Sequence, residues 1–387
     1  MFDTNMPLNQ KNIAILSISL TSGGAEKVIS LLLKELRNDY KVTLVLFHGV
    51  LHFPVPEGVE VYAMSDKSQN RPFYKKCFDL IRFIFIYYRF IKKRNIEISI
   101  SFLAFPNLIN GVVASFNKNV KTIISERGFP SDNVTSKLSF YISKIFYPIL
   151  YNKCDKLFSN SVYINNDLKD NFGVKIPMEV IYNPIELPVK TINPERLNTQ
   201  TNKLKLITAG TINKRKNHIM VVRAINASKL DYDFSILGDG DLRTYLTEEI
   251  AKFKLEDQVS LKGKVKNVND YLIANECFVL SSFTEGFPNA LIEAMAVGLP
   301  CVSTNCLSGP LELLNENEAV DIKNGEFCIG KYGLLVNNDD HIGLSKALDY
   351  YHANPEERER FGRLSLERAK AYELKSIYSQ FNQFIKS

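Results

Sequence analysis

Short runs of apolar residues, rich in Ile, Val and Leu, alternate along the chain with longer segments of helical periodicity. Runs of about four to eight apolar residues are typical of strands buried on both faces of a parallel sheet. Six runs lie in the first half of the chain, at 13–19, 41–47, 59–63, 98–103, 121–125 and 156–159. Five lie in the second half, at 204–209, 233–237, 258–261, 277–281 and 300–304. The two sets predict two α/β domains, each built on a doubly wound parallel sheet.

A polar segment over 183–202, with Pro184, Pro188 and Pro194, separates the two sets. This composition predicts a linker between domains. We therefore expect an N-terminal domain over 1–185, a linker over 186–202 and a C-terminal domain over 203–372. One more helix is predicted over 373–387, and the sequence leaves open whether it packs back on the N-terminal domain.

Positive charge is concentrated in the first half of the chain. Of the 48 Lys and Arg and the 42 Asp and Glu residues, 24 cations but only 16 acids lie within residues 1–190. This excess suits a phosphate-bearing partner, and a solvated basic surface is the equally good alternative. The six cysteines form no CxxC pair, no secretory signal is visible, and no apolar run reaches the ~20 residues of a membrane span. We therefore expect a cytoplasmic protein that does not cross a membrane.

Paired glycines follow the first predicted strand. Gly23 and Gly24 stand just before a helix, where a glycine backbone lets an anion approach the free N–H groups of the helix. A tight turn explains the pair about equally well. An NAD-binding enzyme is not expected, because the GxGxxG fingerprint is absent and the second strand does not end on an acid.

Cations follow the first strand of the second half. The loop that begins at Gly210 carries Lys214, Arg215 and Lys216 before the next helix. Such a loop is suited to binding a diphosphate, and solvated lysines are the equally common alternative.

Two glutamates bracket the start of a later helix. Glu285 stands in a loop after a strand, 286–289 opens the helix, and Glu293 lies among apolar residues within it. Burying that second carboxylate is costly unless ligand hydroxyl groups or a salt bridge accompany it. The pair is therefore a candidate for holding a polar ligand at the helix N-terminus.

These loops resemble those of the retaining glycosyltransferases of family 4, which have the GT-B fold. The resemblance covers nearly the whole chain in the expected order, at 23–26, 210–217, 238–240, 263–265 and 285–293. The last stretch, two glutamates separated by seven residues, is the family's strongest motif. The resemblance implies two Rossmann-like domains that face a cleft, with the nucleotide sugar bound by the second domain.

The resemblance also implies roles for individual residues. Glu293 would bind the donor ribose, Glu285 the hydroxyl groups of the donor sugar, and Lys216 the diphosphate. Gly23 and Gly24 would lie beside the same diphosphate. Further donor contacts would come from Gly210, Val265, Phe287, Pro288, Asn289, Ala290 and Leu291.

The chain departs from the family at two places. Thr211 stands where the family commonly has arginine, and Arg215 is a candidate substitute for the missing cation. No histidine follows the fourth predicted strand, where many members place one near the reacting carbon. The stretch 125–130 is similar to a motif of bacterial polysaccharide and lipid-linked oligosaccharide transferases, which makes Glu126 and Arg127 candidates for acceptor or active-site contacts.

The resemblance implies retaining transfer of a hexose or N-acetylhexosamine from a nucleotide sugar, with a UDP-sugar the preferred donor. The expected acceptor is a glycan or an undecaprenyl-diphosphate-linked sugar in the synthesis of capsule, lipopolysaccharide or another surface polysaccharide. We expect no metal and no cofactor, since the nucleotide sugar is a substrate, and no nucleic acid partner, since no basic–aromatic sheet motif is present. The alternative is a catalytically silent GT-B protein that binds a sugar nucleotide or glycan as a partner subunit.

The segment 73–94 predicts a helix with a basic stripe. Lys75, Arg82, Arg89 and Lys93 share one helix face, while aromatic residues and isoleucines fill much of the rest. We expect this helix to lie on an anionic membrane, which would place the protein at the inner face of the cytoplasmic membrane. A core helix with extended cationic side chains is the alternative.

Overall fold

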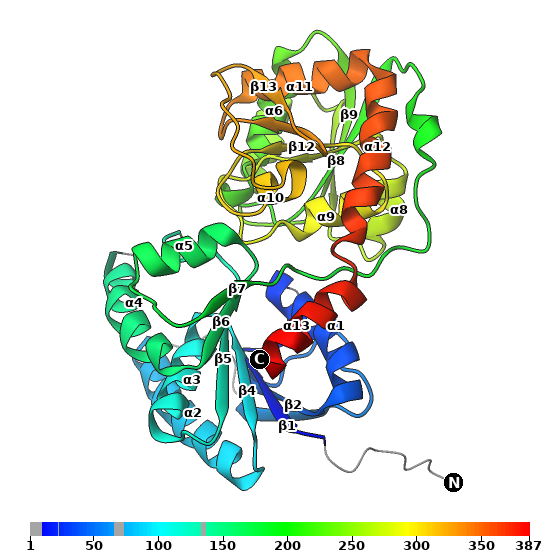
Figure 1. Ribbon diagram of the computed structural model, residues 1–387. Helices are drawn as coiled ribbons and strands as arrows, with labels where there is room; N and C mark the ends of the chain where they lie inside the picture. Colours follow the sequence, from blue (N-terminus) through cyan, green and yellow to red (C-terminus); the bar gives the residue numbers. More distant parts are fainter. Residues whose placement is uncertain (1–9, 22, 66–72, 133–136) are drawn as a thin grey trace. The chain divides into compact units, whose positions relative to one another are not determined.

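The structure, a computed structural model, describes residues 10–21, 23–65, 73–132 and 137–387. The chain divides into two compact units, each an α/β fold built on one sheet (Figure 1). The N-terminal unit comprises Met1–Pro184 and Leu374–Ser387, and the C-terminal unit comprises Ile185–Glu373.

The described residues of the N-terminal unit form a seven-stranded parallel sheet in the order β3-β2-β1-β4-β5-β6-β7. The strands are β1 (Asn12–Ser17), β2 (Lys41–His48), β3 (Glu60–Ser65), β4 (Ile98–Phe102), β5 (Lys121–Glu126), β6 (Lys156–Ser159) and β7 (Met178–Val180). The helices are α1 (Gly24–Asp39), α2 (Phe73–Lys93), α3 (Ala104–Phe116), α4 (Lys137–Leu150), η1 (Tyr151–Lys153), α5 (Val162–Asp170) and α13 (Leu374–Lys386). In β1, Ile13 and Ile15 pack with α1 and α13, whereas Ala14 and Leu16 pack with α2 and α3. Burial on both faces explains the continuous apolar runs of the sequence.

Helix α2 is chiefly a core helix. Its buried side chains are Phe83, Tyr87, Phe90 and Ile91, and among its described side chains the exposed large apolar ones are Ile81 and Phe85. The predicted basic stripe is exposed at Arg82, Arg89 and Lys93, while the side chain of Lys75 lies outside the described residues. Over the part of this helix whose side chains are described, from residue 79 onward, the buried side chains pack on the sheet and Ile81 and Phe85 remain uncovered. None of the helices in the described ranges is both long and apolar enough to cross a bilayer.

The described residues of the C-terminal unit form a second seven-stranded sheet in the order β10-β9-β8-β11-β12-β14-β13, parallel except for the β13–β14 pair. The strands are β8 (Lys203–Ala209), β9 (Asp231–Leu237), β10 (Val259–Gly263), β11 (Cys277–Leu280), β12 (Cys301–Thr304), β13 (Phe327–Ile329) and β14 (Leu334–Val336). The helices are η2 (Pro194–Leu197), η3 (Lys214–Lys216), α6 (His218–Ala227), α7 (Arg243–Lys252), α8 (Val268–Ile273), α9 (Asn289–Ala296), α10 (Pro310–Asn315), α11 (His341–Ala353) and α12 (Pro355–Lys370).

The segment 186–202, expected to be a linker, packs on the C-terminal unit. The N–H of Ile192 donates to the carbonyl of Val297 at 2.8 Å. The buried guanidinium of Arg358 donates to the carbonyl of Thr199 at 2.6 Å. The boundary between the units therefore lies at residue 184, before this segment, and the chain returns to the N-terminal unit after residue 373.

Candidate active site

Glycines at the carboxyl ends of β8 and β9 bring two loops into backbone contact. A Cβ built on Gly238, whose φ is +133°, would lie 1.9 Å from the carbonyl oxygen of Gly210. A Cβ on Gly240 would lie 2.2 Å from the carbonyl oxygen of Ile212. No other residue type fits at such distances. This close packing fixes the start of the loop that carries the cations.

The cationic turn η3 is held on both sides. The side chain of Asn213 accepts from the N–H of Lys216 at 3.0 Å, and Asn217 takes the left-handed conformation with a φ of 48°. The hydroxyl of Ser281 donates to the carbonyl of Lys216 at 2.9 Å, and the N–H of Phe283 donates to the carbonyl of Arg215 at 2.8 Å. The turn after β8 is thus tied to the loop after β11.

Glu285 lies at the centre of this arrangement. Its carboxylate is 4% exposed, and Lys216 Nζ lies 2.5 Å from its Oε1, while Arg215 Nη1 lies 3.3 Å from its Oε2. The hydroxyl of Ser282 donates to Oε1 at 2.6 Å. Burial by itself raises the pKa of this carboxyl, but the two cations and the Ser282 hydroxyl hold that pKa below its ordinary value. The carboxylate is therefore ionised at neutral pH.

The adjacent His218 is neutral. It begins α6, and its burial, to which the Lys216 charge adds, lowers the pKa of its imidazole to about 4, although Glu285 acts in the opposite direction. The two cations and the single carboxylate then leave this cluster with a net positive charge. A positive cluster at the carboxyl ends of parallel strands is suited to a diphosphate.

The loop before α9 is rigidly supported. Gly309, with a φ of +101°, lies against Pro288, because a Cβ on it would come within 2.3 Å of the proline Cδ. The hydroxyl of Ser308 donates to the carbonyl of Gly286. The ring of Phe287 lies 5.7 Å from that of Tyr372. The predicted donor contacts therefore stand on a fixed backbone, with Phe287, Pro288 and Leu291 buried and Asn289 and Ala290 half-exposed.

Glu293 is not buried, although its apolar neighbours in the sequence suggest that it would be. Leu291, Ile292, Ala294 and Met295 occupy the core-facing side of α9, whereas Glu293 is half-exposed on the remaining side. Val265, after β10 and Gly263, is also half-exposed. The predicted ribose ligand Glu293 and the predicted donor contact Val265 thus lie on accessible parts of the same unit as Lys216 and Glu285.

The glycine pair lies in the other unit. Gly23 is the N-cap of α1 and Gly24 its first residue, after β1. A Cβ on Gly23 would lie 2.1 Å from Oε2 of Glu26, so this turn is closed by a side chain as well as by its backbone.

Glu126 and Arg127 are interior residues at the end of β5. Glu126 accepts from the hydroxyl of Tyr151 at 2.6 Å and from Nδ2 of Asn107 at 3.1 Å. Burial raises the pKa of its carboxyl to about 7, although both hydrogen bonds oppose that rise. The predicted acceptor role of Glu126 remains a prediction, and its 3% exposure favours a positioning role.

The guanidinium of Arg127 lies over two neighbouring aromatic rings. Its Cζ lies 5.2 Å from the ring centroid of Phe102 and 4.8 Å from that of Phe158. It donates to Oδ1 of Asn183 at 2.9 Å. Burial lowers the pKa of this guanidinium to about 9, with Glu126 acting in the opposite direction. Arg127 is therefore a cation fixed in place at the carboxyl edge of the N-terminal sheet.

Sequence reasoning missed the residues that hold these groups. Ser282 and Asn213 lie within three positions of predicted site residues along the chain. Their polar side chains in these charged loops were the signal that could have identified them as supports. Tyr151 and Asn107 lie too far from Glu126 along the chain for any local pattern to connect them.

Two family models match consecutive parts of the chain. The model described as glycosyl transferases group 1 matches residues 189–367, and the one described as glycosyltransferase family 4 matches residues 22–188. The chain belongs to the family 4 glycosyltransferases. The resemblance seen in its loops is thereby confirmed.

Two relatives of this glycosyltransferase come from Campylobacter jejuni. It is 29% identical over 367 residues, or 94% of this chain and 96% of the relative, to N-acetylgalactosamine-N,N'-diacetylbacillosaminyl-diphospho-undecaprenol 4-alpha-N-acetylgalactosaminyltransferase. It is 25% identical over 96% of its length, and 98% of the relative, to GalNAc-alpha-(1->4)-GalNAc-alpha-(1->3)-diNAcBac-PP-undecaprenol alpha-1,4-N-acetyl-D-galactosaminyltransferase.

Solved structures share the fold. Sucrose-phosphate synthase from Thermosynechococcus elongatus matches with a TM-score of 0.77 and 17% identity, covering 97% of this chain and 98% of the other. Anabaena HepE in complex with UDP and glucose matches with a TM-score of 0.75 and 15% identity, covering 97% of this chain and all of the other. These likenesses establish the GT-B fold that the strand pattern and loops predict.

Proposed function

We propose that this glycosyltransferase moves an N-acetylhexosamine, or a related hexose, from a UDP-sugar to an undecaprenyl-diphosphate-linked acceptor, with retention of configuration. The observation that carries the donor half of this proposal is the buried carboxylate of Glu285, which forms ion pairs with Lys216 and Arg215 just before the start of α9. The acceptor half is supported by the two Campylobacter relatives, whose names give undecaprenol-linked substrates and which match over nearly their full length.

The reaction requires charge separation at the anomeric carbon. The bond from this carbon to the diphosphate breaks, and its electron pair goes to the diphosphate. The acceptor hydroxyl oxygen bonds the same carbon on the same face, and its proton goes to a diphosphate oxygen. Cations that are already in place stabilise the departing diphosphate without reorganisation, which is commonly the largest catalytic contribution.

Each group of the site has a place in this reaction. Lys216 has three ammonium protons, so it can hold Glu285 and still donate to a phosphate oxygen. Arg215, whose side chain is 49% exposed, can reach the same anion. Glu285 would accept from sugar hydroxyl groups and Glu293 from the ribose. No residue is assigned as a covalent nucleophile.

The same proposal places the enzyme at the inner face of the cytoplasmic membrane, where an undecaprenyl-linked acceptor is anchored. It requires no metal ion, since the cations of the site take the role of a metal on the diphosphate.

The test uses the full chain, a panel of UDP-, GDP- and ADP-sugars, and an undecaprenyl-diphosphate-linked N-acetylhexosamine as acceptor. We expect UDP release that depends on acceptor, survives EDTA and yields an α-linked product by NMR. A catalytically silent protein would bind the UDP-sugar without releasing UDP, either with acceptor or slowly by hydrolysis. A β-linked product would contradict retention.

A further inference from the structure

Helix α4 leaves a row of large apolar side chains uncovered. Tyr141, Ile142, Ile145, Phe146 and Ile149 are all exposed, at 38–61%. Their spacing of four residues places them along one side of the helix. The opposite side packs into the unit, where Tyr147 stacks on Tyr151 at 4.4 Å between ring centroids.

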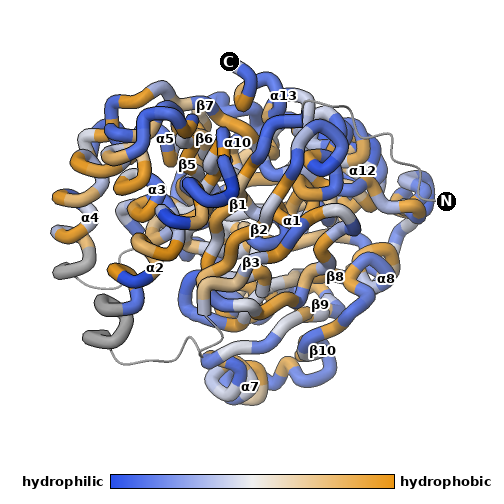
Figure 2. The backbone as a smooth tube through the Cα atoms, turned by 90° about the horizontal axis from the view of Figure 1, so that it is seen from below, coloured by the Kyte–Doolittle hydropathy of each residue, from blue (hydrophilic) through white to orange (hydrophobic). Residues whose placement is uncertain are grey.

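A patch of this kind is unusual on a protein surface. Single exposed apolar residues need no explanation, but a contiguous row marks a surface that meets another apolar phase. The core of the unit does not need these side chains, because α4 already contributes its inner side to the cluster around Tyr151 and Phe172. Figure 2 shows hydrophobic residues along α4, at the edge of the N-terminal unit.

The charges around this row indicate what it meets. No acid occurs in α4, and the exposed Lys144 lies within it. Helices α2, α3 and α4 share one face of the sheet, and α2 exposes Arg82, Arg89 and Lys93. An apolar row on a helix without acids, on the same face of the sheet as the cations of α2, is complementary to anionic headgroups over acyl chains.

Self-association is less compatible with the same surface. A second copy seated on this row would bring its own α2 cations into the contact region, with no acids on α4 to pair with them. An anionic bilayer neutralises those cations and covers the apolar row at once.

We infer that the outer side of α4 inserts into the headgroup region of an anionic membrane, while the cations of α2 contact lipid phosphates. This inference rests on the proposed lipid-linked acceptor and adds to it the element that holds the enzyme at the bilayer. Most of the apolar contact that the sequence places on α2 thus falls to α4, while the described part of α2 adds Ile81 and Phe85. Helix α2 chiefly supplies charge, through Arg82, Arg89 and Lys93.

The experiment compares Ile145→Ser/Phe146→Ser with the matched control Val189→Ser/Ile342→Ser, whose residues are exposed apolar positions of the C-terminal unit. Both are sedimented with vesicles of ~30% phosphatidylglycerol in phosphatidylcholine. We expect the α4 variant to bind at least ~10-fold more weakly than wild type and the control to bind normally. Thermal melting should show that both remain folded, since all four positions are exposed.

Three results would overturn the inference. The first is that wild type does not bind the vesicles. The second is that the α4 variant binds as wild type does, while Arg82→Glu/Arg89→Glu alone abolishes binding. The third is that wild type forms a concentration-dependent dimer that the α4 variant abolishes, without vesicle binding.

Transfer assays separate this inference from the proposed function. The α4 variant should lose transfer to an acceptor embedded in vesicles but keep transfer to a short-chain, water-soluble diphosphate-linked acceptor. Failure of wild type with every acceptor would contradict the proposed function, and the vesicle result would still decide the role of α4. Equal loss on both acceptors would overturn the inference, because α4 would then act on the catalytic site itself.

Discussion

Glu285 is a buried carboxylate whose ionisation depends on its two neighbours. A lone carboxylate in the interior would take up a proton or destabilise the fold, because the loss of hydration is not repaid. Here Lys216 lies on one oxygen and Arg215 on the other, while His218 beside them is held neutral by burial. The carboxylate in turn holds the two cationic side chains in the site; without it they would extend into solvent. Each group therefore has a structural role in addition to any contact with a substrate.

Lys216 is the first residue to test. Lys216→Ala should lower turnover by roughly 10²–10³-fold, the scale of losing one preorganised charge contact to the departing diphosphate. Lys214→Ala is the matched control, because Lys214 belongs to the same turn but is exposed, and it should change turnover less than ~2-fold. Steady-state kinetics of the two variants measure both turnovers. Near-normal turnover of a folded Lys216→Ala protein would remove the basis for the donor site described above.

Glu285→Gln keeps the shape of the side chain but removes its charge. We expect kcat/KM for sugar transfer to fall by ~10-fold or more, since a charge-assisted hydrogen bond is worth ~1.5–3 kcal/mol. Binding of UDP should persist or strengthen, because the two cations lose their internal anion. Calorimetry with UDP measures the second effect, and Glu326→Gln, an exposed acid of the same unit, serves as control. Loss of UDP binding would instead make Glu285 a ligand of the nucleotide or a structural residue.

The sequence predicts the charged residues of this site but not their supports. Lys216 and Glu285 could be found because each stands in a loop after an apolar strand, and such loops converge at one edge of a parallel sheet. That Lys216 pairs with Glu285 does not follow, since 69 residues separate them and only the strand order brings their loops together. The burial of Glu293 was overestimated because its apolar neighbours occupy a different side of α9.

Elements with a strong periodic pattern are the ones that the sequence predicts well. All eleven predicted strands are present, with each end within two residues of the predicted one. The strands β7, β13 and β14 were missed because three residues are too few for a pattern to emerge. Helices α2 and α4 show the limit of composition. Both are apolar and basic, and only tertiary packing determines that α4 exposes a row of five large apolar side chains whereas the described part of α2 exposes Ile81 and Phe85.

The polar contacts around Glu126 join β5, α3 and η1, and they predict how stability depends on pH. The folded protein holds the Glu126 proton with a pKa of about 7, against an ordinary 4.5. Between these values the unfolded chain loses a proton that the folded chain keeps, so stability should fall as pH rises through this window and level off above it. The slope from this group is at most ~1.4 kcal/mol per pH unit.

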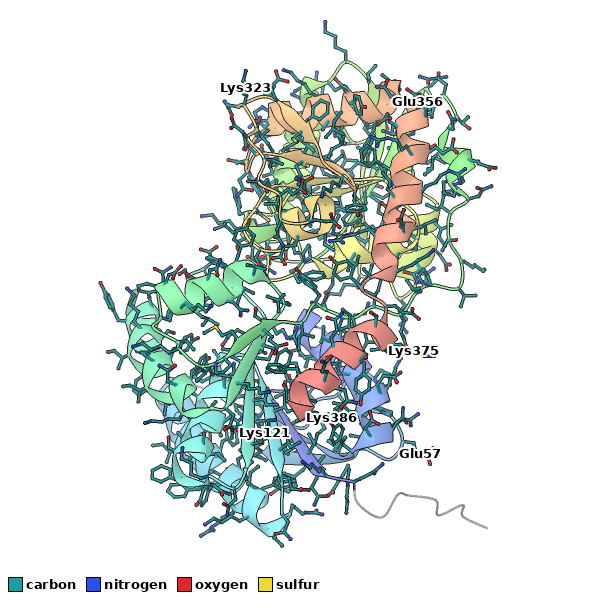
Figure 3. All side chains as sticks on the ribbon, in the orientation of Figure 1. Glu57, Lys121, Lys323, Glu356, Lys375 and Lys386 are labelled. Atoms are coloured by element: carbon teal, nitrogen blue, oxygen red, sulfur yellow. The ribbon has the colours of Figure 1, made fainter. Side chains whose placement is uncertain are left out.

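Glu126→Gln cannot titrate, so its stability should depend less on pH over the same window. Urea unfolding of the N-terminal unit at pH 5, 6, 7 and 8 measures this. Glu57→Gln, at an exposed acid labelled in Figure 3, is the control and should keep the wild-type slope. Parallel curves for wild type and Glu126→Gln would show that Glu126 is already ionised in the fold.

At the scale of the whole molecule, the two ends of the chain belong to one unit. Helix α13 follows the C-terminal unit in sequence but packs on α1, where Tyr40 donates to Asn382 at 2.6 Å and Tyr378 donates to Asp39. Lys121 donates to the carbonyl of Ile385 at 2.8 Å, and Figure 3 shows Lys121 near Lys386 at the end of this helix. A cation at the C-terminal end of a helix is favourable there. The sequence predicts this helix but not its partner, because its apolar side is suited to either unit.

Deleting residues 374–387 should therefore unfold the unit at the opposite end of the chain. The helix buries Leu374, Ile377, Tyr378, Phe381, Phe384 and Ile385. At ~1.5–3 kcal/mol for each such side chain, their burial is comparable to the ~5–15 kcal/mol that stabilise a whole domain. We expect calorimetry of the truncated chain to lose the transition of the N-terminal unit while the transition of the C-terminal unit and its stabilisation by UDP remain. Lys375→Ala, at an exposed position of the same helix, should leave both transitions unchanged, and Phe381→Ala should lower only the first. If UDP no longer stabilised the truncated protein, the donor site could not be assigned to the C-terminal unit alone.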